Sequence, residues 1–311
     1  MTWSCIRQRF SPSSIAPACR RAVNVPPKEQ FDGVVVTGSG APLPRLSGGV
    51  NPRVFDGHSF WLNLPQILSL LQNDPAPSVA IIGAGGTAAA IAHWFVREQI
   101  TDIPVTVIGR EATLFIRTST PFEDRLFSDE AAWAALAPHV REAFVARLTR
   151  GVVWDYVLHR LGGANNIQYR SADVRHFAPT GAPTPSSTPP AIMAVLDHPP
   201  DPKAPAPATP PAPVGFLSAA VFVDARGFDA WGFTRLLPTA LAGQLANRAT
   251  VMGNIDYHLC VGAPFPGGLH VPMLASIQGP AAPNLMALGW MSDRILRRYV
   301  TPIVAKWRPA G

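Results

Sequence analysis

A glycine-rich turn between a short apolar strand and an amphipathic helix limits most strongly what this chain can fold into. Residues 79–82 (Val-Ala-Ile-Ile) have the composition of a buried strand, and the turn Gly83-Ala84-Gly85-Gly86-Thr87 follows at once. The apolar residues after the turn recur at helical spacing: Ala88, Ile91, Ala92 and Phe95. A second apolar run at residues 105–108 closes the pattern within about 30 residues, as a β-α-β unit requires. This order predicts a doubly wound α/β domain.

The turn and the first helical residues match the dinucleotide-binding pattern G-x-G-x-x-A. We expect Gly83 to allow the sharp turn, Gly85 to let backbone approach a pyrophosphate, and the small Ala88 to let the helix pack closely on the sheet. The free N–H groups at the helix start, at Gly86 and Thr87, would then bind the pyrophosphate. The alternative is a glycine turn with a structural role alone, and the flanking strand, helix and strand favour the dinucleotide site.

The end of the second strand indicates which dinucleotide is bound. An NAD site has a carboxylate there for the ribose 2′-hydroxyl, whereas an NADP site has an arginine near the 2′-phosphate. Here Gly109 occupies the position of the acid, and Arg110 follows before Glu111. The sequence therefore favours NADPH with Arg110 at the phosphate, and the alternative is that Arg110 is a solvated surface side chain.

Composition argues against several other classes of protein. The longest apolar stretch, residues 79–95, contains three glycines and His93, so we expect no membrane span and a soluble, cytoplasmic protein. The 3 cysteines form no C-x-x-C pair and the histidines show no ligand spacing, which argues against a metal site and a disulfide framework. The net charge is +6, but 5 of the 26 basic residues lie within residues 1–28, which contain no acid. We therefore expect no nucleic-acid partner.

The remaining sequence predicts further elements of an α/β fold. We expect strands within residues 31–40, 192–196 and 217–224, and helices at residues 60–71, from 129 to a break at Pro138 and beyond, at 152–161 and at 291–306. Residues 178–214 hold 13 of the 34 prolines and predict a surface excursion. Residues 1–30 show no periodicity, which predicts a disordered or aberrant start, with a transit peptide as the alternative.

Longer stretches of the sequence are similar to a known family. These stretches are SVAIIGAGGTAAA, VTVIGREATLFIRTSTPFEDRLFSDEAAWAAL, LTRGVVWDYV and LHVPMLASIQGPAAPNLMALGWMSDRIL. From residue 31 to about residue 300, the chain resembles the flavin-dependent N-hydroxylating monooxygenases of siderophore biosynthesis. Within that family it is most similar to the lysine N6-hydroxylases of the mycobactin type.

This resemblance implies a function and a domain organisation. In such enzymes NADPH reduces FAD, O2 reacts with the reduced flavin, and the neutral side-chain amine of lysine is hydroxylated, with no catalytic side chain and no metal required. The implied architecture is an NADPH-binding, Rossmann-like domain (residues 75–215) inserted into a partial FAD-binding domain (residues 31–74 and 216–311). A homo-oligomer is possible.

The resemblance also implies site residues. Residues 121–127 match the family's loop near nicotinamide and substrate, which makes Phe122 and Asp124 candidate substrate contacts. Asp124 stands where the family usually has Asn, which favours a contact to the substrate's ammonium group over one to its carboxylate. The family's C-terminal loop over the flavin corresponds to Gln278, Gly279 and Asn284, and Asp224 to Phe228 match a family strand end only weakly.

The FAD fingerprint of the family, a G-x-G-x-x-G after an N-terminal strand, does not precede Phe31 in this sequence. The resemblance therefore implies an N-terminally truncated member, and we expect the 311 residues by themselves neither to hold FAD tightly nor to hydroxylate an amine. Two alternatives to lysine hydroxylation stay open. One is an ornithine N5-hydroxylase, because one methylene contributes only about 1–3 kcal/mol to discrimination. The other is a non-catalytic dinucleotide-binding remnant.

Overall fold

A computed structural model provides the structure of this chain, and it divides into two compact units. The structure describes residues 3–6, 31–48, 50–118, 120–149, 151–180, 191–200, 212–263, 265, 268–282, 284 and 287–300. The first unit comprises Met1–Ala41, Thr120–Val145 and Asp229–Gly311. The second comprises Pro42–Ser119 and Ala146–Phe228. Each unit is therefore built from segments that are distant in the sequence.

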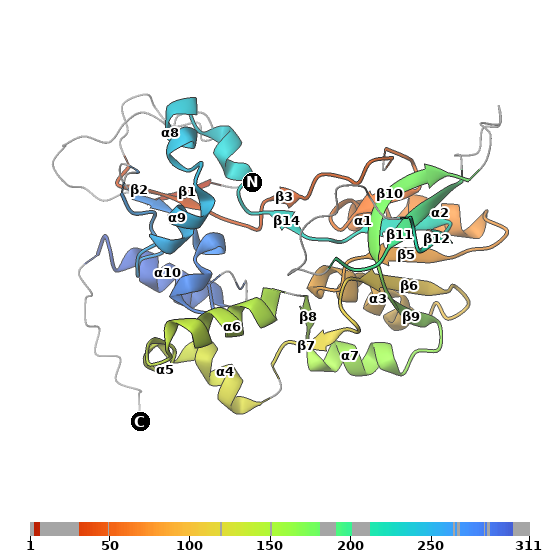
Figure 1. Cartoon of the computed structure of the whole chain (residues 1–311), viewed down its shortest axis with the longest axis horizontal. Helices are drawn as coiled ribbons and strands as arrows, with labels where there is room; N and C mark the ends of the chain where they lie inside the picture. The colour runs from red at the N-terminus through yellow and green to blue at the C-terminus, as the bar shows by residue number, and fades with distance from the viewer. Residues whose placement is uncertain are drawn as a thin grey trace. The chain divides into compact units, whose positions relative to one another are not determined.

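Five parallel strands form the central sheet of the second unit, in the order β4-β13-β5-β6-β9, of which Figure 1 labels β5, β6 and β9. They are β4 (Val54–Asp56), β13 (Val221–Asp224), β5 (Val79–Ile82), β6 (Val105–Gly109) and β9 (Ile167–Ser171). Every residue of β5 and β13 is buried, so both faces of the sheet are covered. The predicted α/β class with a Rossmann-like parallel sheet is confirmed.

Alternate residues of β5 face two different hydrophobic layers. Val79 and Ile81 belong to a core that includes residues of the helices α2 (Leu64–Gln72), α3 (Gly86–Arg97) and α7 (Asp155–Gly162). Ala80 and Ile82 belong to a second core, formed with an antiparallel sheet. That sheet consists of β10 (Asp173–Pro179), β11 (Ile192–Asp197) and β12 (Gly215–Ser218). Because strand side chains alternate between faces, the unit has three layers: helices, parallel sheet and antiparallel sheet.

The strand–turn–helix–strand unit predicted from the sequence is confirmed. Elements β5, α3 and β6 follow one another, and β5 pairs in parallel with β6. The predicted apolar face of α3 is fully buried: Ala88, Ile91, Ala92 and Phe95. The strand expected inside the proline-rich segment is β11, which is central in the antiparallel sheet. Residues 181–190 and 201–211 of that segment lie outside the described residues.

Three predicted elements of this unit differ in the structure. The helix expected at residues 60–71 is two helices, α1 (Ser59–Leu62) and α2, because Pro65 in the first turn of α2 has no N–H to continue a single helix. The strand expected at residues 217–224 is divided between β12 and β13, which belong to different sheets.

The helix expected from residue 152 begins three residues later. Val152–Val153 instead form the short strand β8, which pairs in parallel with β7 (Phe115–Ile116). β-Branched valines favour this extended pairing, and α7 starts only at Asp155.

A three-stranded sheet and several helices form the first unit. The sheet has the order β1-β2-β15, with β1 (Trp3–Ile6), β2 (Gly33–Val36) and β15 (Gly268–His270). The helices that lie in this unit or begin in it are α4 (Pro121–Ser128), α5 (Glu130–Ala134), α6 (Pro138–Thr149), α8 (Thr239–Gln244), α9 (Arg248–Gly253) and α10 (Leu288–Leu296). Among the described residues, 3-10 helices lie at Gly232–Leu236, Pro272–Leu274 and Ser276–Gln278. A separate core of buried residues, including Phe233, Leu259 and Ile295, holds these elements together.

Two terminal predictions are corrected in this unit. Residues 3–6 were expected in an unstructured start, but they pair antiparallel with β2, whose open edge accepts them. Residues 7–30 of that predicted start lie outside the described residues. The C-terminal helix expected at residues 291–306 begins earlier, as α10, and ends at Leu296, while residues 301–306 lie outside the described residues.

The compact units divide the chain differently from the predicted domains. Residues 42–74 and 216–228 were expected in the FAD-binding part but lie in the second unit, because β4 and β13 pair in its parallel sheet. Residues 120–145 were expected in the NADPH-binding domain but cluster with the first unit, where Glu130 pairs with Arg294. The short strands β3 (Ala41–Pro42) and β14 (Phe228–Asp229) pair with each other.

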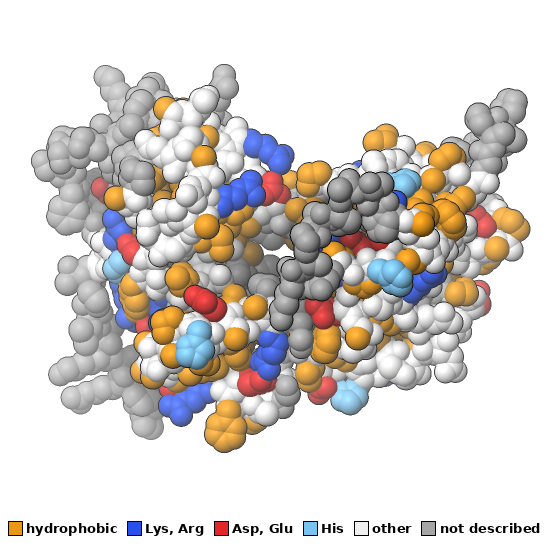
Figure 2. All heavy atoms as spheres, viewed as in Figure 1, with side chains coloured by type: hydrophobic (Ala, Val, Ile, Leu, Met, Phe, Trp, Pro, Cys, Tyr) orange, Lys and Arg blue, Asp and Glu red, His pale blue; other side chains and the backbone are white. Residues whose placement is uncertain are grey.

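Charges are interspersed on the face of the molecule in Figure 2, where acidic and basic side chains lie among one another. Within the described ranges, no helix is long and apolar enough to cross a membrane. The same residues contain no group of three His, Cys, Asp or Glu side chains that could hold a metal ion.

Candidate functional site

The glycine turn lies at the carboxyl end of β5, between β13 and β6. The order of the sheet reverses here, because the chain continues from β5 to β6 on one side and places β13 on the other. Gly83 N–H donates to the Ile108 carbonyl (2.7 Å) and Ala225 N–H donates to the Ile82 carbonyl (2.7 Å). Such a switch point at the carboxyl edge is where open α/β sheets bind their ligands.

Packing of the fold alone explains Gly83. Its φ of +125° is a conformation that other residues rarely adopt, and a Cβ would lie 2.4 Å from the Ala225 carbonyl oxygen. Glycines from two other segments pack against the same turn. A Cβ at Gly57 would lie 2.6 Å from Thr87 Cγ2, and one at Gly151 would lie 3.0 Å from the Ala84 carbonyl oxygen. The turn is therefore enclosed by backbone from several segments of the second unit.

Gly85 and Gly86 are different, because the fold leaves room for a side chain at both. A Cβ at Gly85 would meet only the Gly151 Cα at 3.9 Å, and one at Gly86 would meet nothing within 4 Å. Gly85 has an extended backbone (φ −95°, ψ −172°) that any residue can adopt. As the N-cap of α3 it supplies no side-chain oxygen to the first amides, which have no intrahelical acceptor. Open space beside unpaired amides at a helix start is a geometry that suits an anion such as a pyrophosphate.

The end of β6 has no room for the acid of an NAD site. A Cβ at Gly109 would lie 2.5 Å from the Tyr169 hydroxyl oxygen and 2.7 Å from Ala84 Cβ. Arg110 follows with a side chain that is 62% exposed, and its Nε donates to Asp173 Oδ1 (2.9 Å). The structure thus brings Arg110 to the same edge as the glycine turn, where it is held by a carboxylate.

A buried ion pair that the sequence did not reveal lies at the same edge. The Asp224 side chain, at the end of β13, is 4% exposed and accepts two hydrogen bonds from the Arg226 guanidinium, from Nε and Nη2 at 2.8 Å each. Arg226 Nη2 also donates to the Pro44 carbonyl (2.7 Å). Arg226 therefore neutralises a buried carboxylate that would otherwise repel an anion at the neighbouring turn.

The second group of candidates, Gln278 and Gly279, forms a turn in the first unit. Gly279 has a φ of +137°, which favours glycine. The Gln278 side-chain amide donates to the Ile255 carbonyl (2.7 Å), so the fold uses that side chain. Asn284 is half-buried, and its backbone N–H donates to the Ala281 carbonyl (2.8 Å). The backbone is held as well, because Gln278 N–H donates to the Ala275 carbonyl (2.9 Å) and Gly279 N–H donates to the Ser276 carbonyl (3.2 Å).

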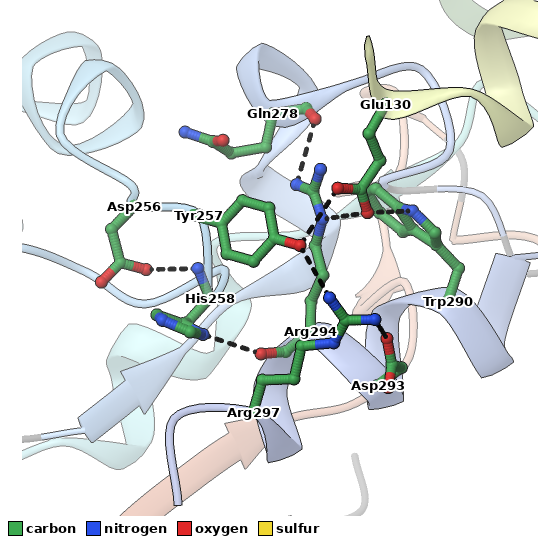
Figure 3. A network of polar contacts seen from close by, with 9 residues as sticks. All are labelled: Glu130, Asp256, Tyr257, His258, Gln278, Trp290, Asp293, Arg294 and Arg297. Carbon is green, nitrogen blue, oxygen red and sulfur yellow. Dashed lines mark hydrogen bonds and ion pairs between the residues drawn. The ribbon is translucent and has the colours of Figure 1, made fainter. Parts of the chain in front are cut away.

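A network around Arg294 holds this turn (Figure 3). Arg294 Nη1 donates to the Gln278 carbonyl (3.2 Å), and its Nε donates to Glu130 Oε1 (3.1 Å). The guanidinium carbon lies 4.2 Å from the centre of the Tyr257 ring and 4.1 Å from that of Trp290, and Arg294 is only 4% exposed. Glu130 also accepts from the Tyr257 hydroxyl (3.0 Å) and Trp290 Nε1 (2.9 Å). Burial acts to raise the pKa of Glu130, but its hydrogen bonds hold the pKa below the usual value.

Both candidate substrate residues lie on α4 of the first unit. Thr120 caps this helix by accepting from Glu123 N–H, and Pro121 begins it. Phe122 is 84% exposed and the Asp124 side chain is exposed. The helix thus presents an aromatic ring and a carboxylate to the surface.

Comparison with known proteins gives a consistent group of relatives. No protein-family model matches the chain. It is 32% identical over 277 residues to an L-lysine N6-monooxygenase of Mycobacterium sp. (strain MCS), which covers 85% of this chain and 58% of that protein. The chain therefore spans less than two thirds of the length of that relative.

Solved structures show the same fold. A lysine monooxygenase from Nocardia farcinica is 25% identical with a TM-score of 0.59, over 85% of this chain and 60% of that one. An ornithine N-hydroxylase of Kutzneria sp. 744, solved with reduced FAD, NADP+ and L-ornithine, is 18% identical with a TM-score of 0.55, over 86% and 64%.

Replacing Gly85 by Ala tests whether its missing side chain serves a ligand. Because a Cβ has room there, the midpoint of thermal unfolding should stay within about 2 °C of wild type. The Kd for NADPH should rise about tenfold or more, equivalent to ~1.4 kcal/mol, because the Cβ would obstruct the pyrophosphate. Gly83→Ala is the matched contrast and should lower stability by about 1–3 kcal/mol. Unchanged NADPH affinity in a folded Gly85→Ala protein would assign Gly85 no part in binding.

Replacing Arg294 by Met tests how much the network stabilises the C-terminal turn. The change removes two cation–π contacts and leaves the Gln278 carbonyl unpaired, so the free energy of unfolding should fall by about 2 kcal/mol or more. Arg235→Met is the control in the same unit. Arg235 is exposed and pairs with Asp229 outside the network, so its loss should cost about 0–1 kcal/mol. Equal losses in urea unfolding would contradict the role given to Arg294.

Proposed function

Because the chain is homologous to L-lysine N6-monooxygenases over 85% of its length, we propose that it takes part in the NADPH- and FAD-dependent N-hydroxylation of the lysine side-chain amine. The relative of known structure from Nocardia farcinica is a lysine monooxygenase with an NADPH domain. Within this chain, the observation that supports the proposal best is the glycine turn at the carboxyl end of β5, whose geometry suits a bound dinucleotide. The substrates are then lysine and O2.

The NADPH part of the proposal rests on the carboxyl edge of the parallel sheet. Gly85 and Gly86 leave open space in front of the first amides of α3, which suits a pyrophosphate. Gly109 leaves no room for the carboxylate that an NAD site needs, whereas Arg110 is exposed beside it. We therefore assign the pyrophosphate to the glycine turn and the 2′-phosphate to Arg110.

The FAD part rests on the turn at Gln278 and Gly279 and on the fold shared with a hydroxylase that holds reduced FAD. The turn is rigid, since Arg294 binds its carbonyl and Gln278 is bonded to Ile255. We assign this turn to the flavin site, with Asn284 in the same loop. When bound there, FAD would supply the redox chemistry that uses electrons from NADPH to activate O2.

The substrate part assigns recognition of the amino acid to α4. The side-chain amine of lysine must be uncharged to react, although its free pKa is about 10.4. We propose that Phe122 covers the reacting end from water and that Asp124 accepts a hydrogen bond from the α-ammonium group, since a carboxylate only accepts. Both side chains are exposed and accessible to a ligand.

Replacing Arg110 by Ala tests the cofactor assignment. The Kd for NADPH should rise about tenfold or more through loss of a charge-assisted phosphate contact, while the Kd for NADH changes little. Titration of both nucleotides by fluorescence measures this. Arg97→Ala, which removes an exposed arginine paired with Glu98 in the same unit, is the control. An equal loss for NADPH and NADH would refute the assignment of Arg110.

The substrate is tested once the FAD site is filled. In a preparation with FAD bound and NADPH supplied, lysine should give a higher kcat/KM for hydroxylamine formation than ornithine does. A higher value for ornithine would correct the substrate and keep the reaction class. A preparation that binds NADPH but neither retains FAD nor oxidises either amine would support the dinucleotide-binding alternative.

A further inference from the structure

Tyr169 connects the end of β6 to the turn that follows it. In the parallel pair of β6 and β9, Tyr169 is opposite Val107, two residues before Gly109. Its hydroxyl oxygen lies where a Gly109 side chain would be, 2.5 Å from an ideal Cβ. The same hydroxyl donates to the Glu111 carbonyl oxygen at 2.8 Å. One side chain thus occupies the position of the missing acid and binds the backbone just beyond it.

Arg110 lies between Gly109 and Glu111, and hydrogen bonds hold the carbonyl groups of both neighbours. On one side, the Gly109 carbonyl accepts from Ala172 N–H (2.8 Å), which continues the ladder with β9. On the other side, the Glu111 carbonyl is held by Tyr169. Asp173 then orients the Arg110 side chain through Nε. The backbone of the turn cannot rotate at Arg110 without breaking one of these contacts.

The Tyr169 hydroxyl stays a donor across the physiological range. Burial raises its pKa above the usual value near 10, and the negative charge of Glu111 raises it further. A tyrosine with a raised pKa is protonated at neutral pH. It therefore keeps its hydrogen bond to the Glu111 carbonyl wherever the enzyme is assayed.

We propose that Tyr169 is a positioning residue for cofactor specificity: by holding the Arg110–Glu111 turn, it presents Arg110 to the 2′-phosphate of NADPH. The proposal rests on the NADPH site proposed above. The preference for NADPH over NADH is thereby assigned to two linked features. One is the exclusion of a carboxylate at Gly109, and the other is the fixed backbone at Arg110. A tyrosine that serves packing alone would affect stability and leave the choice of nucleotide unchanged.

Tyr169→Phe in the full chain is the test, because it keeps the ring against Gly109 and removes only the hydroxyl. The probes are 2′,5′-ADP and 5′-AMP, which differ by the 2′-phosphate. Affinity for 2′,5′-ADP should fall about fivefold, the effect of one net hydrogen bond, and affinity for 5′-AMP should stay within about twofold. Tyr156→Phe, which alters an exposed tyrosine of α7, is the matched control and should change neither.

A double-mutant cycle shows whether Tyr169 acts through Arg110. In an Arg110→Ala background, Tyr169→Phe should have no further effect on 2′,5′-ADP binding. Equal changes for both probes, or additive losses in the double variant, would overturn the role of Tyr169 alone. Wild-type protein with no preference for 2′,5′-ADP would instead overturn the proposed NADPH site, and the inference with it.

Discussion

Close approach of backbone segments around residues 83–87 is the constraint on which the second unit depends. Segments from four other parts of the unit reach this turn, at Gly57, Gly109, Gly151 and Ala225. At each contact, a Cβ on the glycine of the pair would lie 3.0 Å or less from an atom of the other segment. Such close approach is possible only where those Cβ atoms are absent. The crowding ends at Gly85 and Gly86, so the open side of the turn is the side where the first amides of α3 lie.

The C-terminal turn of the first unit is held in a different way. Side chains from α5 and α10 and from residue 257 surround one buried guanidinium, that of Arg294, which contacts two aromatic rings and a carboxylate. Glu130 remains partly exposed, so the pair avoids the full desolvation of two charges. The second unit therefore positions its candidate ligand groups with glycines, which have no side chain. The first unit does so with large side chains packed around Arg294.

Local patterns in the sequence were sufficient to predict the central β-α-β unit, because its strand and helix periods are strong and its glycines follow a known turn pattern. They did not show Tyr169 or the Glu130–Arg294 pair. Tyr169 acts 58 residues from Glu111, and Glu130 lies 164 residues from Arg294, so only the fold brings these partners together. The division of residues 217–224 between two sheets was missed for a similar reason. A continuous apolar run does not record which neighbour each half will pair with.

The position of β13 in the sheet has a consequence for synthesis of the protein. It lies between β4 and β5, yet it is the last of the five strands in the sequence. During translation β4 therefore has no partner in the sheet, and β5 keeps one open edge, until Val221–Asp224 leave the ribosome. Pairing across so many intervening residues is slow, and apolar strands with open edges aggregate readily. The sheet of the second unit thus stays incomplete until β13 has been synthesised, which makes chaperone binding most useful in that interval.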